Sequence, residues 1–118
     1  MLTEYSVLIP KHDNDRRRTD VASSILHRFV RYTSEHFGGC SVTEGEGCYI
    51  MKNGNLAVDK WWKVSIITED ADKIDAVIRA LVSTICKHLD QESVMITKTN
   101  VEREFASDLN HKDLFNVA

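Results

Sequence analysis

Residues 61–89, WWKVSIITEDADKIDAVIRALVSTICKHL, contain a strand pattern followed directly by a helix pattern. The first residues, Trp61 to Thr68, are mostly aromatic or β-branched and predict a strand whose side chains alternate between two faces. Thr68 or Asp70 is expected to cap the helix, because either side-chain oxygen can accept a hydrogen bond from its first turn. Apolar residues then recur with the spacing of one helix face at Ile74, Val77, Ile78, Leu81, Val82, Ile85 and Leu89. The stretch therefore predicts a sheet strand joined to an amphipathic helix.

The same succession of strand and helix occurs near the N-terminus. Tyr5 to Ile9 alternates with a period of two and stops at Pro10, which cannot donate to a strand ladder. Thr19 or Asp20 is the expected N-cap of the helix, and Gly38 is expected to end it in the left-handed conformation that glycine adopts without strain. The apolar stripe of this helix consists of Ala22, Ile25, Leu26, Phe29, Val30, Thr33 and Phe37.

The segment between the two helices is rich in turn signals. Gly45 and Gly47 predict a bend or a bulge in this segment. Asn53-Gly54 predicts a hairpin turn of type I′, which requires positive φ at both central residues. After the second helix, residues 93–99 alternate again and predict the last strand.

Strands and helices in this order predict an α+β fold, a ferredoxin-like antiparallel sheet with two helices on one face. The expected domain covers residues 1–106, and residues 107–118 form a tail that is either docked or loose. Strand alternation turns Trp62 toward the helices, so Trp61 is expected to be exposed on the face without helices. An uncovered sheet face with large side chains often binds a partner, which favours a homodimer or a higher homo-oligomer.

The composition excludes several classes of protein. With 118 residues and a net charge of −3, the chain lacks the strongly basic character typical of nucleic-acid-binding proteins. No signal peptide and no run long enough to span a bilayer is visible, so we expect a cytoplasmic protein. The three Cys residues lack C-x-x-C spacing and are expected to be free thiols, with a Cys40–Cys48 disulfide as the alternative. We expect neither a cofactor nor a bound metal.

The stretch HFGGCSVTEGEGCYIMKNGNLAVDKWWKVSI, from His36 to Ile66, resembles a family of small uncharacterised bacterial and phage domains. The shared pattern is a helix ending in Phe-Gly-Gly, a strand with Thr, a Gly near an aromatic residue, a Gly turn and an acidic residue. In this chain the pattern consists of Phe37, Gly38, Gly39, Thr43, Gly47, Tyr49, Gly54 and Asp59. The family also has a Gln-Glu-x-Val stretch after the second helix, which lies here at 91–94. The family aromatic near Cys48 is often Trp, where this chain has Tyr49. The resemblance spans Tyr5 to Phe105 and implies a ferredoxin-like fold. It also implies that such proteins are frequently encoded by phages and mobile elements, and it implies no established activity.

Three arginines, Arg16, Arg17 and Arg18, precede the first helix. They could clamp an anion, because guanidinium groups and free helix amides both favour negative charge. The alternative is a solvated loop in which neighbouring acids and bases neutralise one another.

No motif of a known enzyme class is present: the chain has no P-loop, dinucleotide fingerprint or nucleophile elbow. His36, Cys40 and Cys48 lack a fourth ligand and the spacing of a zinc site. His36 and Asp59 are the candidate general bases if the protein is an enzyme.

These features favour a non-catalytic, oligomeric binding protein that recognises a nucleotide-like small molecule or a protein partner, in a setting such as phage interference with a host system. The expected ligand-binding residues are Arg16, Arg17, Arg18, Gly38, Gly39, Tyr49 and Trp61. The alternatives are a small ferredoxin-like enzyme with a general acid or base in an oligomer cleft, and a structural assembly module.

Overall fold

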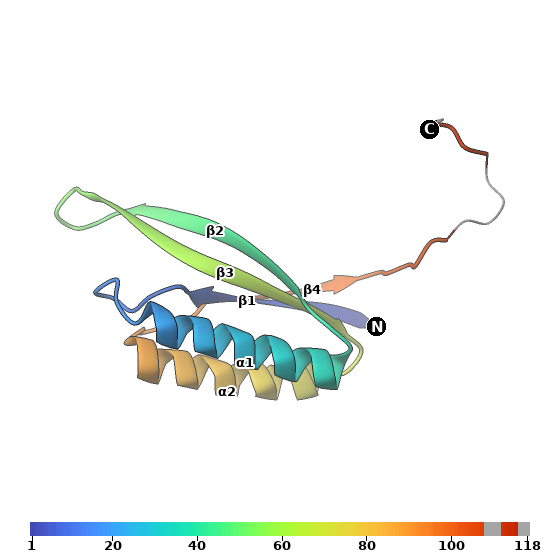
Figure 1. The fold of residues 1–118 in the computed structure, drawn as a ribbon, viewed down its shortest axis with the longest axis horizontal. Coiled ribbons are helices and arrows are strands. Elements are labelled where there is room, and N and C mark those ends of the chain that lie inside the picture. Colours follow the sequence, from blue (N-terminus) through green and yellow to red (C-terminus); the bar gives the residue numbers. More distant parts are fainter. Residues whose placement is uncertain (108–111, 116–118) are drawn as a thin grey trace.

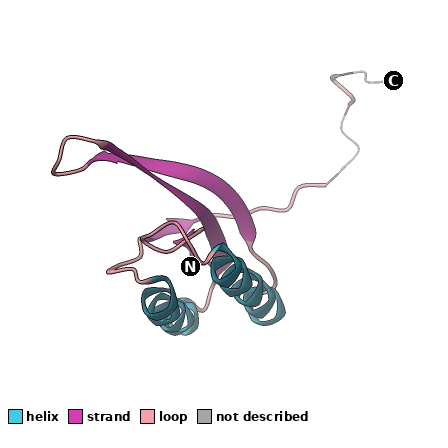
Figure 2. Cartoon of the chain, turned by 60° about the vertical axis from the view of Figure 1, so that its left-hand side comes forward, coloured by secondary structure: helices cyan, strands magenta, loops and turns pink. Residues whose placement is uncertain are grey.

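The computed structural model describes residues 1–107 and 112–115. Within these residues, a four-stranded antiparallel sheet carries two helices on one face, with the strand order β2-β3-β1-β4 (Figures 1 and 2). The expected ferredoxin-like α+β fold is confirmed. The elements in chain order are β1 Leu2–Pro10, α1 Thr19–Phe37, β2 Ser41–Ile50, β3 Leu56–Thr68, α2 Ala71–Leu89 and β4 Ile96–Val101.

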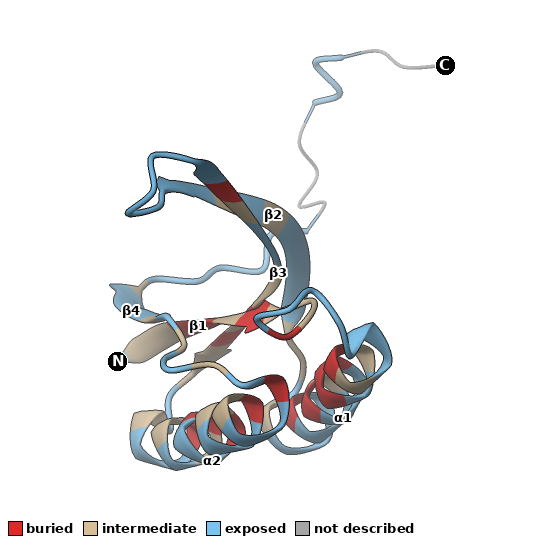
Figure 3. Ribbon diagram, turned by 90° about the vertical axis from the view of Figure 1, so that its left-hand side faces the viewer, coloured by how far each residue is buried: buried red, intermediate tan, exposed pale blue. Residues whose placement is uncertain are grey.

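The core lies between the two helices and the central strands β1 and β3 (Figure 3). The inward residues of β1 include Val7 and Ile9, and those of β3 include Val64 and Ile66, all fully buried. The apolar stripe of α2 closes over them with Ile78 fully buried at its centre. Trp62 packs against this core, as its alternation with Val64 predicts. The two predicted helical stripes therefore cover one face of one sheet.

Two of the three predicted helix ends are confirmed. Gly38 ends α1 with φ 81°, and Asp70 caps α2 by accepting a hydrogen bond from the amide of Lys73 at 3.2 Å. The predicted N-cap of α1 at Thr19 or Asp20 is wrong, because the helix already includes Thr19 and its cap is Arg18. Arg18 has φ 54° and offers no side-chain cap, so the loop before the helix sets this boundary.

Two features expected in the β2–β3 hairpin, a bulge and a type I′ turn, are absent from it. The register runs without interruption from the pair Ser41 and Ser65 to the pair Ile50 and Leu56, so Gly45 and Gly47 make no bulge. In the turn, only Gly54 has positive φ, at 84°. The amide of Gly54 donates to the carbonyl of Met51, and the amide of Met51 donates to the carbonyl of Asn55. This is the three-residue loop with a left-handed glycine, instead of a type I′ turn.

The β2–β3 hairpin extends past the end of β1, where Pro10 pairs with Trp61 (Figure 1). Residues 46–60 therefore form a two-stranded projection, which we call the arm, and it curls over the face without helices (Figure 3). Cys40, Cys48 and Cys86 are free thiols. Neither helix in the described part of the chain combines the length and apolar character needed to cross a membrane.

After β4, residues 102–107 run away from the sheet without regular structure (Figure 1). The tail predicted for residues 107–118 falls largely on 108–111 and 116–118, which lie outside the described residues. The domain boundary at residue 106 therefore stays a prediction.

Candidate functional site

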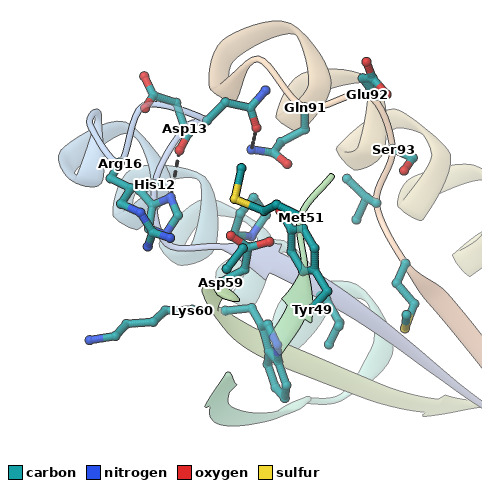
Figure 4. A pocket seen from close by; sticks show the side chains of 17 residues that line it. His12, Asp13, Arg16, Tyr49, Met51, Asp59, Lys60, Gln91, Glu92 and Ser93 are labelled. Atoms are coloured by element: carbon teal, nitrogen blue, oxygen red, sulfur yellow. Dashed lines mark hydrogen bonds between the residues drawn. The ribbon is translucent and has the colours of Figure 1, made fainter. Parts of the chain in front are cut away.

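A pocket of about 620 Å³ lies where the arm meets the body of the protein, on the face of the sheet without helices (Figure 4). Four segments that are distant in sequence form its walls: the end of β1 with the following loop, the end of β2, the start of β3, and the segment after α2. We call it the arm pocket. Its lining includes the side chains of His12, Arg16, Tyr49, Asp59, Trp61 and Glu92.

The loop between β1 and α1 is organised around Asp13, which is only 8% exposed. One carboxylate oxygen of Asp13 accepts hydrogen bonds from the amides of Asp15, at 3.0 Å, and Arg17, at 2.7 Å. The other oxygen lies 3.8 Å from the guanidinium of Arg18. Because a buried carboxylate is stable only when it is hydrogen-bonded or paired, these contacts hold the loop in one conformation.

The same loop is tied to the end of α2 and to the segment that follows it, which forms another wall of the arm pocket. The guanidinium of Arg18 donates to the carbonyl of His88 at 2.8 Å, and Asn14 donates to the carbonyl of Asp90. Gln91 in turn donates to the side chain of Asn14 at 3.0 Å (Figure 4). Two walls of the pocket are thus joined by hydrogen bonds between residues 70 to 77 positions apart.

The three neighbouring arginines have different positions. Arg16 lies in the wall of the arm pocket and has φ 59°, a left-handed conformation that is uncommon for a residue other than glycine. Arg18 is engaged by Asp13 and by the end of α2, and Arg17 does not line the pocket. A clamp of three arginines is therefore not assembled; Arg16 alone faces the pocket.

The predicted glycine pair and His36 lie elsewhere. Gly38 and Gly39 join α1 to β2, at the opposite end of β2 from Tyr49. His36 stacks on Tyr32 along α1, with a distance of 4.0 Å between the ring centroids, and Nδ1 of His36 lies 2.9 Å from the Tyr32 carbonyl. The described residues contain no group of three potential metal ligands.

The structure brings Arg16, Tyr49, Asp59 and Trp61 together around the arm pocket. Tyr49 and Asp59 are exposed. Trp61 does turn away from the helices, but it is half-buried, and the expectation of an exposed side chain needs correction. Its indole lies against Gly45 of the neighbouring strand, which removes part of the ring from solvent.

Sequence reasoning did not identify His12 or Glu92 as pocket residues. Nδ1 of His12 lies 2.7 Å from the carbonyl oxygen of Asp13, a contact in which a ring N–H donates. Nε2 is buried and has no hydrogen-bond partner among the described residues. For His12 the signal in the sequence is the density of polar residues between Lys11 and Arg18, and for Glu92 it is the Gln-Glu-x-Val stretch at 91–94. Neither signal reveals which side chain faces a pocket.

Comparisons with known proteins add a structural likeness. No protein-family model matches the chain, and no curated protein matches it. A phage SAM lyase in complex with S-methyl-5′-thioadenosine has a similar structure, with a TM-score of 0.57, 16% sequence identity, and coverage of 83% of this chain and 80% of the lyase. A de novo designed protein with a ferredoxin fold aligns over 94% of both chains, with a TM-score of 0.38 and 15% identity. At these identities the likeness to the lyase concerns the fold.

Proposed function

We propose that this chain is a cytoplasmic, non-catalytic binding protein that holds a nucleoside-type small molecule in the arm pocket. The observation that carries the proposal is the combination of two aromatic side chains, Tyr49 and Trp61, with charged groups of both signs in one pocket of about 620 Å³. This volume lies in the range of small-molecule sites, roughly 300–1,000 Å³. Aromatic rings stack on bases, while carboxylates accept hydrogen bonds from ribose hydroxyls.

The charged residues suggest how such a ligand would be oriented. Asp59 and Glu92 offer acceptors on opposite walls, one in the arm and one after α2. Arg16 offers a guanidinium that makes no ion pair within the described residues. A nucleoside with an anionic tail would satisfy both kinds of group. The lyase that shares this fold was solved with S-methyl-5′-thioadenosine, a nucleoside without a charged tail. S-adenosylmethionine adds a carboxylate to the same nucleoside, so these two molecules are the first probes.

The proposal includes assembly into a homo-oligomer. The arm exposes apolar side chains on both of its faces, with Tyr49 53% exposed on one and Ile50 68% exposed on the other. A hairpin without a third strand or a packed face is marginally stable in water. A second copy that covers the arm would bury these side chains. In the setting that the phage-type resemblance implies, sequestering a host nucleoside would be the means of interference.

Isothermal titration calorimetry with S-methyl-5′-thioadenosine and with S-adenosylmethionine tests the binding proposal. We expect saturable binding of at least one probe by the wild-type protein. Trp61→Ala should weaken binding by about tenfold, in line with about 1–3 kcal/mol for a stacked base. Asp59→Asn should weaken it by about tenfold as well, because it removes a charged acceptor for ribose hydroxyls. His36→Ala is the matched control, because His36 lies on α1 outside the pocket. A wild-type protein that binds neither probe would refute the proposal.

Light scattering coupled to size-exclusion chromatography tests the assembly. We expect a mass that is a multiple of the 13.5 kDa chain. Replacing Ile50 and Leu56 by Ser should shift the protein toward the monomer, because both apolar side chains project from the arm. A wild-type protein that is monomeric at all concentrations would contradict this part of the proposal.

A second candidate function is catalysis in the same pocket with Asp59 as the general base. The observation that favours it is an exposed carboxylate in the pocket wall of a fold that a lyase also uses. Incubation with S-adenosylmethionine, followed by mass spectrometry, would reveal products. An enzyme predicts turnover that Asp59→Asn abolishes while binding remains, whereas the binding protein predicts unchanged S-adenosylmethionine.

A further inference from the structure

Gly45 and Trp61 are direct cross-strand partners in the β2–β3 ladder, and their contact is unusually close. A Cβ atom placed on Gly45 would lie 2.2 Å from Cη2 of the Trp61 indole, 2.6 Å from Cζ2 and 2.8 Å from Cζ3. All three atoms belong to the outer, six-membered ring. Real Cβ atoms essentially never approach other atoms so closely. Any side chain at position 45 would therefore displace the indole or the strand.

The three distances also show how the ring is oriented. Cζ2 and Cζ3 flank Cη2, and both are only slightly farther from the added carbon than Cη2 is. If the carbon met the edge of the ring, the flanking atoms would be about two-thirds of a bond length farther away than Cη2, which is more than the structure shows. The indole therefore lies with one face against the backbone of Gly45.

Gly47 extends the same surface along β2. A Cβ atom on Gly47 would lie 3.7 Å from the indole nitrogen, which is an ordinary contact distance. The indole thus spans two glycines of one strand, and one of its faces is covered by peptide backbone. Aromatic side chains that cover a cross-strand glycine are a known device for stabilising sheets. The other face is turned away from β2, and Trp61 is a half-buried residue of the arm-pocket wall.

We propose that Trp61 is the stacking surface of the arm pocket and that Gly45 is the residue that positions it. This inference rests on the proposed function and specifies its ligand: the bound molecule must present a planar aromatic ring, such as a purine, to the free face of the indole. A fixed indole loses little conformational freedom when a base stacks on it, so the orientation set by Gly45 contributes to affinity. Gly45 then has a role in the site that no turn or bulge explains.

Gly45→Ala and Gly47→Ala form a matched pair for the test. The same methyl group is added two positions apart on the same strand, but only at position 45 does it collide with the indole. Titration calorimetry with S-methyl-5′-thioadenosine, or with S-adenosylmethionine if only that probe binds the wild type, should show binding weakened at least tenfold by Gly45→Ala and unchanged within about twofold by Gly47→Ala. Each of these affinities is compared with that of the wild-type protein.

Fluorescence quenching of Trp61 by the ligand is a second measurement. It would not change if Gly45 had a purely structural role. The chain has two Trp residues, so Trp62→Phe leaves Trp61 as the only indole. In this background we expect S-methyl-5′-thioadenosine to quench the emission, and Gly45→Ala to remove most of the quenching at a saturating concentration of the probe. If Gly45→Ala alone does not fold, adding Trp61→Phe removes the colliding ring, and the double variant should fold but bind weakly.

The outcomes separate this inference from the function on which it rests. Tight binding by the wild type with equal affinity for Gly45→Ala would overturn the stacking surface and leave the proposed function standing. Quenching that persists in Gly45→Ala would also overturn it. No binding of either S-methyl-5′-thioadenosine or S-adenosylmethionine by the wild type would overturn both proposals.

Discussion

The body and the arm of the sheet are built from the same strands but differ in what covers them. In the body, the inward side chains of β1 and β3, such as Val7 and Ile66, are fully buried beneath two helices. In the arm, Ile50 and Leu56 occupy the equivalent face of the hairpin and are 68% and 61% exposed. Both regions are antiparallel ladders with regular register. The two regions therefore share their backbone pairing, but only the body buries most of its apolar side chains, and most of the stability comes from there.

The largest expected effect is the loss of a core side chain in the body. Ile78→Ala should lower the free energy of unfolding by about 2–5 kcal/mol, because it removes buried methyl groups and leaves a cavity. Leu56→Ala in the arm is the counterpart and should change it by less than about 0.5 kcal/mol in the monomer. Urea denaturation followed by circular dichroism measures both. Equal losses of unfolding free energy at the two positions would contradict the difference between body and arm. A loss for Leu56→Ala that grows with protein concentration would indicate that a second copy covers the arm.

A smaller effect is expected from the loop that joins the body to the arm pocket. Asp13→Ala leaves the amides of Asp15 and Arg17 without their carboxylate acceptor, which should cost about 1–3 kcal/mol. The exposed neighbour Asp15 is the control, since Asp15→Ala removes no side-chain contact seen among the described residues and should cost less than about 0.5 kcal/mol. Thermal and urea unfolding measure the two variants. An Asp13→Ala protein as stable as Asp15→Ala would show that the loop does not depend on this carboxylate.

The smallest effect concerns the tip of the arm. Gly54 has φ 84° and open space around its Cα, so Gly54→Ala tests backbone strain without a collision. We expect a cost of about 1–2 kcal/mol, the usual penalty of the left-handed conformation for a residue with Cβ. Because the arm has no third strand, hydrogen exchange should quicken in residues 46–60 and stay unchanged in α2. Faster exchange throughout the chain would mean that arm and body unfold as one unit, and Lys52→Ala in the same turn serves as the control.

The sequence predicted the body of the fold better than the arm. The periodic stripes of α1 and α2 and the alternation of β1 and β3 follow from local spacing, since burial on one side of a helix or strand repeats along the chain. The turn at Gly54 was predicted with the wrong type, because Asn-Gly is compatible with more than one loop and the strand lengths on either side decide between them. The cap of α1 was misplaced for a related reason: Arg18 is held by Asp13 and by the end of α2, and the second of these partners is far away in the sequence.

The candidate site shows the same division. Tyr49, Trp61, Asp59 and Arg16 were identified from residue type, and the structure brings them around one pocket. Gly38, Gly39 and His36 were grouped with them because they are near in sequence, yet the length of β2 separates them from the arm. Gly45 was interpreted as a bend, because its partner across the ladder is not visible in a linear pattern.

By itself, the sequence determined which residues form helices and strands and which face of each is apolar, because these properties repeat within a few residues. Only the tertiary structure decided that β3 extends past the end of β1 to form the arm, that Trp61 lies on Gly45, and that Arg16 rather than Arg18 faces the pocket. The physical reason is that these features depend on strand register and on contacts between distant segments. Such contacts are selected by the packing of the whole domain, and no local pattern records them.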